Sequence, residues 1–291
     1  KHSTKGLISK EFEMQIKHNL NNKKQSLILI NRRGYAPVTL CIKCGKKRKC
    51  KYCDSSLVYH KEIDLLMCHQ CGKKEVFESI CNSCNNGKFI FVGTGLERVY
   101  EEVIRLFSNA KIIKLSSDYM NKEIFFKTLK KIENNKIDII VGTQIISKGF
   151  HFPNLNCIVV IDIDLSSQGH DLRGAEKNLQ LYHQLSGRAG RTGKPATVYF
   201  QTYNLNKDMI NNITNKNPDT FLDKELEIRK KNNLPPFQRF ISLILSSSDE
   251  KKLKENSIKF KNYINNKLNS LVLGPVDAPV YKIRKKFRVR L

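Results

Sequence analysis

The sequence has no long apolar run, and this excludes several classes of protein. Stretches such as LILI (27–30) and CIVVI (157–161) have the length of single strands, whereas a membrane-spanning helix needs about 20 apolar residues. A secretory signal is also missing, because the first residues, KHSTKGLISKEFEM, contain no apolar core. We therefore expect a cytoplasmic protein without membrane association.

Acidic residues are scarce as well. The 291 residues include 27 Asp and Glu against 52 Lys and Arg, for a formal net charge of +25. This excess predicts a polyanionic partner, with nucleic acid as the first choice. Part of the excess reflects a general enrichment in Lys and Asn, as in NLNNKK (19–24). The charge alone does not separate DNA, RNA and anionic membrane.

Eight of the nine cysteines form four Cys-x-x-Cys pairs. Both sulfurs of such a pair can face one tetrahedral ion, so four pairs predict two closed, structural four-sulfur zinc sites. Disulfides are disfavoured because the sequence has no secretory signal, and an iron–sulfur cluster is the open alternative. The paired residues are Cys41, Cys44, Cys50, Cys53, Cys68, Cys71, Cys81 and Cys84. The ninth, Cys157, is predicted to be a buried strand residue.

The spacing favours a nested arrangement, in which the two inner Cys-x-x-Cys pairs (Cys50, Cys53, Cys68 and Cys71) share one zinc ion. Cys53 and Cys68 are separated by fourteen residues, 54–67, close to the usual zinc-ribbon spacing. The two outer pairs then share the other ion. Sequential pairing would have to close over only five residues (45–49) and nine residues (72–80). Residues 41–85 contain few apolar residues and structural zinc contributes about 10–16 kcal/mol, so chelation is expected to unfold this segment.

A basic run with one aromatic residue surrounds the first two cysteine pairs. This run is compatible with binding to a nucleic-acid backbone, and equally with a solvent-exposed surface or a surface that docks another protein. The residues are Lys43, Lys46, Lys47, Arg48, Lys49, Lys51 and Tyr52.

From residue 88 onwards, predicted strands alternate with predicted helices. The strands are 88–92, 110–116, 137–142, 157–162 and 196–202, and the helices are about 96–107, 121–134 and 175–190. This order predicts an α/β fold with a parallel sheet covered on both faces. Ligands bind at the carboxyl ends of such strands, which directs attention to GTG (93–95), GTQIISKG (142–149), DID (162–164) and GRAGR (187–191).

A phosphate-cradling loop is missing. VGTGLERV (92–99) and GRTGKP (190–195) are glycine-rich, but neither has the G-x-x-x-x-G-K-[ST] spacing of a Walker A loop. The nearest approach to a DEAH-like acidic box is DIDL (162–165), which lacks its pattern.

Two segments resemble helicase motifs. GTQIISKGFHFPNL (142–155) and QLSGRAGR (184–191) resemble the fifth and sixth motifs of superfamily 2 helicases, which the second RecA-like lobe carries. With the cysteine pairs, INRRGYAP (30–37), GTGLER (93–98), DLRGAEKNLQLYHQLSGRAGR (171–191), LPPF (234–237) and LVLGPVDAP (271–279), the chain is identified as a member of the PriA (primosomal protein N′) family of replication-restart helicases.

The resemblance implies a domain organisation. Residues 1–25 are a connector, 26–40 and 86–204 form the C-terminal RecA-like helicase lobe, 41–85 are an inserted two-zinc module, and 205–291 form a truncated C-terminal α+β domain. The family's DNA-binding region and first ATPase lobe would precede residue 1, and its pattern continues past residue 291. We therefore expect a C-terminal half that is inactive alone.

The resemblance also implies roles for individual residues. Arg188 and Arg191 would be arginine fingers for ATP held by the first lobe, and Gln184 would hold their motif at the cleft. Nucleotide and DNA-backbone contacts would come from Gly142, Thr143, Gln144, Lys148, Gly149 and Gly187. Without the resemblance, these segments are compatible with a solvent-exposed helix end and a strand-ending turn. The run Asp171, Arg173 and Glu176 is compatible with a direct role or with a charge network at a helix start.

The implied function is ATP hydrolysis with Mg, coupled to 3′–5′ translocation on forked or single-stranded DNA. Primosome assembly would follow. The implied partners are primosome proteins and single-stranded DNA-binding protein, and the expected state is a nucleoid-associated bacterial monomer with two zinc ions. The alternative is a non-enzymatic zinc-ribbon DNA-binding relic of such a helicase. Another superfamily 2 remodeller is disfavoured because the cysteine pairs lie within the lobe.

Overall fold

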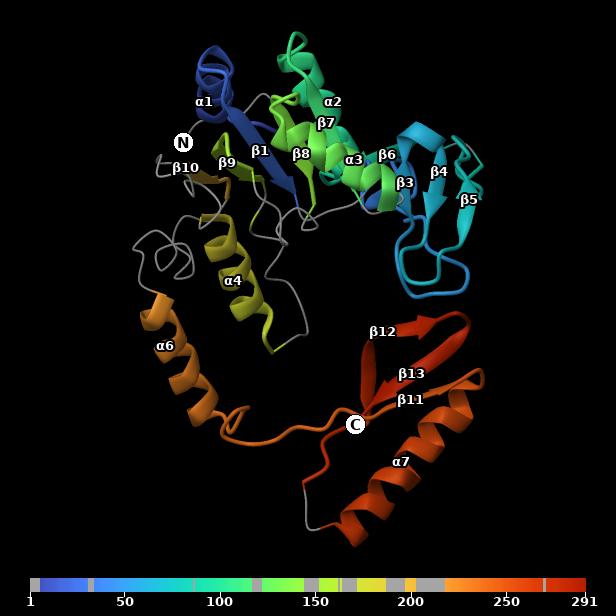
Figure 1. Cartoon of the computed structure of the whole chain (residues 1–291). Coiled ribbons are helices and arrows are strands. Elements are labelled where there is room, and N and C mark those ends of the chain that lie inside the picture. The colour runs from blue at the N-terminus through green and yellow to red at the C-terminus, as the bar shows by residue number, and fades with distance from the viewer. Residues whose placement is uncertain are drawn as a thin grey trace. The chain divides into compact units, whose positions relative to one another are not determined.

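The computed structural model describes residues 6–30, 34–85, 87–116, 122–143, 152–161, 163, 172–186, 197–202, 218–268 and 271–291. The chain divides into two compact units, whose elements are labelled in Figure 1. The first unit comprises Lys1–Tyr35 and Thr94–Glu225, and the second comprises Ala36–Gly93 and Leu226–Leu291. Among the described residues, no helix combines the length and the apolar character needed to cross a membrane.

A five-stranded parallel sheet forms the centre of the first unit. Its strand order is β10–β9–β1–β8–β7, and all four pairings are parallel. The strands are β1 (Gln25–Ile30), β7 (Ile112–Leu115), β8 (Ile139–Gly142), β9 (Leu155–Ile161) and β10 (Thr197–Phe200). All six residues of the central β1 are buried. A parallel strand covered on both faces needs such an uninterrupted run of buried residues.

Helices cover both faces of this sheet. Because side chains alternate along a strand, Leu27 packs in one core with Ile132 of α3, whereas Ile28 packs in the opposite core with Val99 of α2. Within the described ranges, the helices that contribute buried side chains to these cores are α1 (Lys10–Asn21), α2 (Leu96–Leu106), α3 (Lys122–Glu133) and α4 (Gly174–Ser186). The helices α1 and α2 serve one core, and α3 and α4 serve the other. The predicted α/β architecture is therefore confirmed.

One predicted strand lies elsewhere. The strand expected at 88–92 in the parallel sheet is β6 (Phe89–Val92), which pairs antiparallel with β2 (Val38–Cys41) in the second unit. An apolar run of four residues fits either kind of sheet, so periodicity alone does not decide which partner it finds. This pairing brings the first and the last cysteine pairs close together, because β2 ends at Cys41 and β6 begins shortly after Cys84.

The described part of the second unit contains small antiparallel sheets. β3 (Val58–His60), β4 (Leu65–Met67) and β5 (Lys74–Val76) form one of them, with the short helix η1 (Lys61–Ile63) between β3 and β4. β11 (Ile244–Ser247), β12 (Val276–Ile283) and β13 (Lys286–Arg290) form another, in the order β11–β13–β12. α7 (Glu250–Lys267) packs against β11 and β13. α6 (Pro218–Lys231) precedes them in the chain.

An aromatic cluster supports the cysteine-rich part of this unit. The ring of Tyr59 stacks on Phe91 at 4.3 Å between centroids, and Phe77 lies 4.9 Å from Tyr59. Phe89 is within 6.0 Å of Phe77. The segment therefore has more apolar packing than its composition indicated, because β6 contributes two of the rings from outside the cysteine pairs.

Candidate functional site

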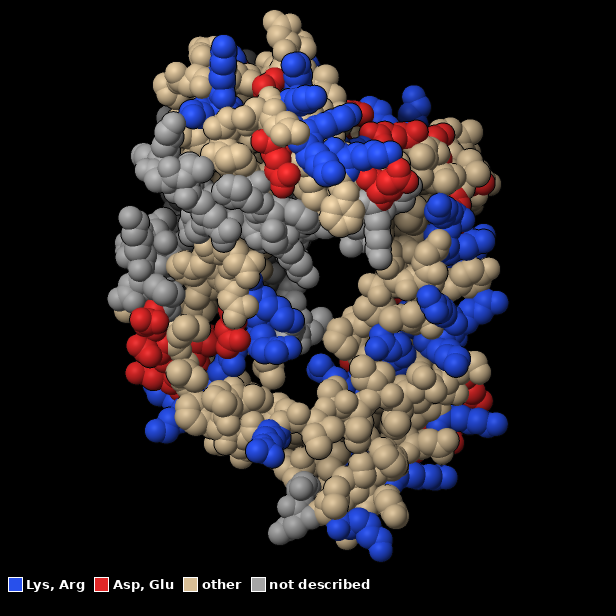
Figure 2. All heavy atoms as spheres, viewed as in Figure 1, with Lys and Arg blue, Asp and Glu red and all other residues tan. Residues whose placement is uncertain are grey.

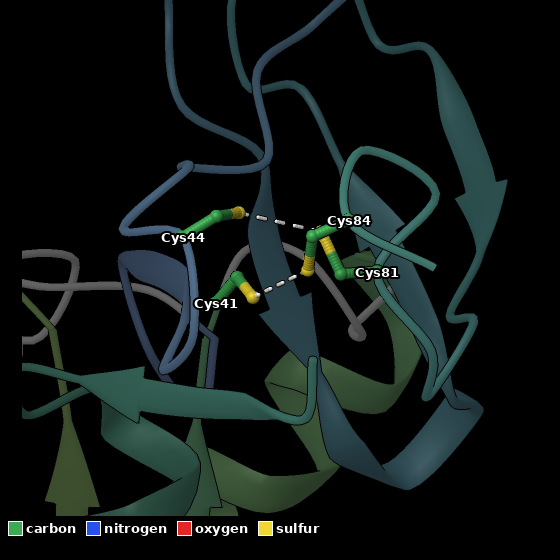
Figure 3. Close-up of side chains that lie close together, drawn as sticks. All are labelled: Cys41, Cys44, Cys81 and Cys84. Carbon is green, nitrogen blue, oxygen red and sulfur yellow. Dashed lines mark hydrogen bonds between the residues drawn. The ribbon is translucent and has the colours of Figure 1, made fainter. Parts of the chain in front are cut away.

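The eight paired cysteines form two separate groups. Within each group the sulfur atoms all lie within 4.8 Å of one another. The first group, of which Figure 3 shows the side chains, is Cys41, Cys44, Cys81 and Cys84, and the second is Cys50, Cys53, Cys68 and Cys71. This is the nested arrangement that the spacing favoured, in which the antiparallel β2–β6 pair brings the outermost cysteine pairs together.

The sulfur geometry fits a tetrahedral metal ion. The Sγ atoms of Cys41 and Cys84 are 3.7 Å apart, and those of Cys44 and Cys81 are 3.8 Å apart (Figure 3). A zinc ion with Zn–S distances of about 2.3 Å sets tetrahedral S–S separations of about 3.8 Å. All nine cysteines are free thiols rather than disulfides. Four sulfurs complete the coordination, so each group fits a closed, structural zinc ion.

The backbone of the cysteine turns explains the residues that follow them. In three of the four turns, the residue after the second cysteine has positive φ and donates its N–H to the carbonyl of the first cysteine. These residues are Gly45, Gly72 and Asn85, with φ of 69°, 78° and 53° and N–O distances of 2.9, 2.8 and 2.8 Å. Glycine and asparagine tolerate this conformation best. In the remaining turn, Asp54 donates instead to Lys282 at 2.8 Å.

Each group contains one cysteine whose pKa lies low. Burial opposes the Cys68 thiolate, but hydrogen bonds from Ser55 and from backbone amides of its turn lower the pKa to about 6. The backbone N–H of Ser83 is the main cause that lowers the pKa of Cys81 to about 6. In contrast, burial raises the pKa of Cys53 to about 12. Since the thiolate is the form that binds metal, these hydrogen bonds favour the ligand form of Cys68 and Cys81.

Concave, strongly basic surface lies beside the cysteine turns. We call it the basic cleft, and its volume is about 1120 Å³. Figure 2 shows Lys and Arg side chains gathered over the loops of the zinc module. Seven basic residues line the basic cleft against two acidic ones: Lys46, Lys47, Arg48, Lys49, Lys51, Lys73 and Lys74, with Glu75 and Glu78.

Basic side chains lie over two aromatic rings of the basic cleft, in cation–π contact. The guanidinium of Arg48 lies 5.2 Å from the ring centroid of Phe89, and its Nη2 is 3.3 Å from Oε2 of Glu78. The Tyr52 ring has Lys73 Nζ at 5.8 Å. The sequence indicated the 46–52 part of this surface. Lys73 and Phe89 come from distant segments, and no local signal linked them to it.

The residues that the resemblance assigned to nucleotide and DNA are partly described. Gly142 ends β8, between β1 and β7 at the carboxyl edge of the parallel sheet. Thr143 follows it and is 8% exposed. Gln184 is exposed in the last turn of α4, next to the buried Leu185. The other assigned residues lie outside the described residues: Gln144, Lys148, Gly149, Gly187, Arg188 and Arg191.

Comparison with known families agrees with this architecture. Residues 72–193 match the helicase conserved C-terminal domain, and residues 50–75 match the PriA DNA helicase Cys-rich region domain. Residues 230–291 match the primosomal protein N C-terminal domain. The fold and the cysteine groups therefore define the C-terminal lobe of a helicase that carries a zinc-binding Cys-rich region.

Curated relatives agree along nearly the whole chain. Replication restart protein PriA of Rickettsia conorii is 42% identical over 99% of this chain and 45% of the relative. The PriA proteins of Borreliella burgdorferi and Bacillus subtilis are 35% and 30% identical, over 98% and 99% of this chain and 43% and 36% of their own lengths. The chain belongs to the PriA family and spans less than half the length of these relatives.

Proposed function

We propose that this chain is the C-terminal portion of an ATP-dependent 3′–5′ DNA helicase that restarts stalled replication forks and assembles the primosome. The observation that carries the proposal is the combination, in one chain, of the helicase C-terminal match with two four-cysteine groups. The names of the relatives, replication restart protein PriA, support the same process. The partners are primosome proteins and single-stranded DNA-binding protein, and the chain acts as a monomer in the bacterial cytoplasm.

The nucleotide chemistry uses arginines of this chain. ATP with Mg is held mainly by a first lobe that contains the Walker motifs, and Arg188 and Arg191 neutralise the charge that develops on its terminal phosphates. Such arginine fingers contribute about 10³–10⁵ in rate. Gln184 orients their motif from the end of α4. This assignment is supported by the position of α4 in the sheet–helix order of the lobe.

The carboxyl edge of the parallel sheet supplies the link to DNA. Gly142 and Thr143 end β8 at this edge, where ligands of open α/β sheets bind. The Thr143 hydroxyl donates to a DNA phosphate, and the following residues Gln144, Lys148 and Gly149 extend this contact. Gly187 leaves room for the neighbouring arginines to approach the phosphates.

The zinc module adds a second DNA contact through the basic cleft. A concave surface with seven basic residues neutralises a phosphate backbone, and the Tyr52 and Phe89 rings can stack on bases. These features favour nucleic-acid contact over a merely solvated face, because isolated surface lysines are not arranged around a hollow that also contains aromatic rings.

The ATPase assignment is tested on a fusion with the part of the Rickettsia conorii relative that this chain does not cover. The 291-residue chain alone is expected to be inactive, and the fusion is expected to hydrolyse ATP when forked DNA is added. In the fusion, Arg191→Ala should lower turnover by about 10³-fold or more and preserve DNA binding. Arg105→Ala, an exposed arginine of α2, is the matched control. Normal turnover of Arg191→Ala contradicts the arginine-finger assignment.

The same fusion separates the proposal from its alternative. DNA binding without any ATP hydrolysis would favour a non-enzymatic zinc-ribbon DNA-binding relic. ATP hydrolysis by the 291-residue chain alone would contradict the assignment of the nucleotide site to another lobe.

The basic cleft is tested by the salt dependence of DNA affinity. Lys46→Ala/Lys47→Ala removes two exposed charges of the cleft, and Lys130→Ala/Lys131→Ala removes two exposed charges of α3. For single-stranded DNA, the cleft variant should reduce the slope of log K against log salt by about 1.4. The α3 variant should leave the slope unchanged. Equal slopes for the two variants contradict the cleft contact.

A further inference from the structure

A turn of the second cysteine group contacts the hairpin of β12 and β13 within the second unit. We call residues 52–54 the knuckle turn and residues 282–285 the hairpin turn. Three backbone N–H groups connect them: Asp54 donates to the Lys282 carbonyl at 2.8 Å, Lys285 donates to the Tyr52 carbonyl at 2.8 Å, and Arg284 donates to Cys53 Sγ at 3.4 Å. Lys285 Nζ also lies 4.9 Å from the Tyr52 ring centroid.

The knuckle turn is incomplete by itself. In the other three cysteine turns, the amide after the second cysteine closes back on the first cysteine. The corresponding amide, that of Asp54, is bonded to Lys282 of the hairpin turn instead. An amide that does not close its own turn must be bonded by another part of the chain or by water, and here the C-terminal domain provides the partner. The second cysteine group is therefore built from two distant parts of the chain.

The hairpin turn adopts a conformation that its own residues disfavour. β12 and β13 pair at Ile283 and Lys286, and the two central residues, Arg284 and Lys285, have φ of 51° and 68°. Two-residue hairpins with positive φ at both positions prefer Asn-Gly or Asp-Gly. A Cβ atom approaches the following carbonyl oxygen in this conformation, Gly has none, and the short polar side chains of Asn and Asp offset the cost by local hydrogen bonds. Arg and Lys do not favour this turn. The contacts with the knuckle turn supply the stabilisation that the local sequence lacks.

One of these contacts involves a metal-binding sulfur. Cys53 Sγ belongs to the second cysteine group and accepts the Arg284 N–H. A hydrogen bond to a ligand sulfur orients it and favours its thiolate form. This hydrogen bond links the position of the hairpin turn to the position of a sulfur of the second cysteine group.

We propose that the zinc ion of the second cysteine group locks the β12–β13 hairpin in place, as a zinc-dependent clamp between the Cys-rich module and the C-terminal domain. Loss of this ion releases the hairpin turn, whereas loss of the ion of the first group does not. By reciprocity, the docked hairpin also raises the affinity of the second group for zinc. This inference is independent of the proposed ATPase and DNA contacts.

The test compares the two zinc centres by amide hydrogen exchange in the zinc-loaded 291-residue chain. Cys68→Ser/Cys71→Ser removes the second ion, replaces no residue of either turn and keeps the Cys50 sulfur that accepts the Tyr52 N–H. Cys41→Ser/Cys84→Ser is the matched control for the first ion. Metal analysis verifies that each variant retains one zinc. Peptides covering 276–290 should exchange about tenfold faster or more in the second-centre variant, and at the wild-type rate in the control. Peptides of β1 and β8 verify that the first unit is folded.

Two results would overturn the proposal. One is unchanged protection of the hairpin after loss of the second ion, and the other is equal loss of protection in both variants, which indicates general unfolding of the module. A further variant tests whether the unfavourable conformation of the hairpin turn is the reason that it needs the zinc ion. Arg284→Asn/Lys285→Gly relaxes the turn by itself, so its hairpin should retain most of its protection when the second ion is lost. If it opens as readily as the native Arg-Lys turn, the clamp is also contradicted.

Discussion

Gly87 offers a way to perturb one zinc centre without removing a ligand. A Cβ atom at this position would lie 2.2 Å from Cys41 Sγ and 2.9 Å from Cys84 Sγ, whereas ordinary contacts begin at 3.4 Å. In Gly87→Ala, the Cys41 sulfur would therefore have to move by 1.2 Å (3.4 minus 2.2). Zinc–ligand distances tolerate only about 0.2 Å. The methyl group and the zinc-bound arrangement of the first group are therefore incompatible without a local rearrangement.

The expected result is loss or weakening of one specific ion. Metal analysis of Gly87→Ala should find close to one zinc per chain. If the ion is retained, a chromogenic chelator should remove it about 10–100 times faster than from the wild type. The second group should keep its ion, because its four cysteines are separate from the first group.

Two glycine variants control for the substitution itself. Gly174→Ala at the start of α4 meets no heavy atom within 4 Å and should behave as wild type. Gly45→Ala also meets none but has φ of +69°, so it strains a cysteine turn without touching a sulfur. It should affect zinc release less than Gly87→Ala does. Two ions with wild-type release kinetics in Gly87→Ala would refute the reasoning.

Three further predictions concern the cores of the two units. Gly95→Ala should lower the free energy of unfolding by about 1–3 kcal/mol, because its Cβ would lie 2.1 Å from the Gly34 carbonyl oxygen; an unchanged denaturation midpoint contradicts this. Burial raises the pKa of Cys157 from 9.0 to about 12, so mass spectrometry should find this thiol unalkylated after zinc chelation exposes the other eight. Between pH 9 and about 12, the Cys157 thiol stays protonated in the folded state and ionises in the unfolded state. The free energy of unfolding should therefore fall as the pH rises through this range, and it should fall less in Cys157→Ala. Tyr59→Ala removes a ring stacked 4.3 Å from Phe91 and should destabilise the zinc-loaded module by about 3 kcal/mol, whereas Tyr59→Phe should cost much less in a thermal melt.

Much of the first unit was predictable because strands that are buried on both faces of a sheet are rich in apolar residues, and this composition is visible in the sequence. The short apolar runs of β8 (IIV) and β9 (CIVVI) predicted strands buried on both faces, and both are interior strands of the parallel sheet. The run LILI of the central β1 has the length of a strand, but it was not among the strands predicted for the sheet. The amphipathic helices between them could only cover its faces. The strand at 89–92 shows the limit, since its four apolar residues fit a parallel or an antiparallel neighbour equally well.

The sequence predicted which cysteine pairs share a zinc ion, because this depends on the number of residues within and between the Cys-x-x-Cys pairs. Two residues between cysteines define a turn, and glycine after Cys44 and Cys71 matches the positive φ found there. Asn85 fills the same position in a third turn, which the glycine pattern alone did not indicate. The fourth turn had no local signal, because its partner, Lys282, lies more than two hundred residues along the chain.

The sequence by itself determined the membership of the cysteine pairs, the alternation of strands and helices, and the family. Each of these depends on residues close together in the chain, where spacing and periodicity act directly. Only the tertiary structure decided that β6 joins β2, that Lys73 and Phe89 complete the basic cleft, and that a hairpin turn docks on Cys53. These contacts join distant segments, and their formation depends on which strands pair and which backbone groups still need a partner after the local structure has formed.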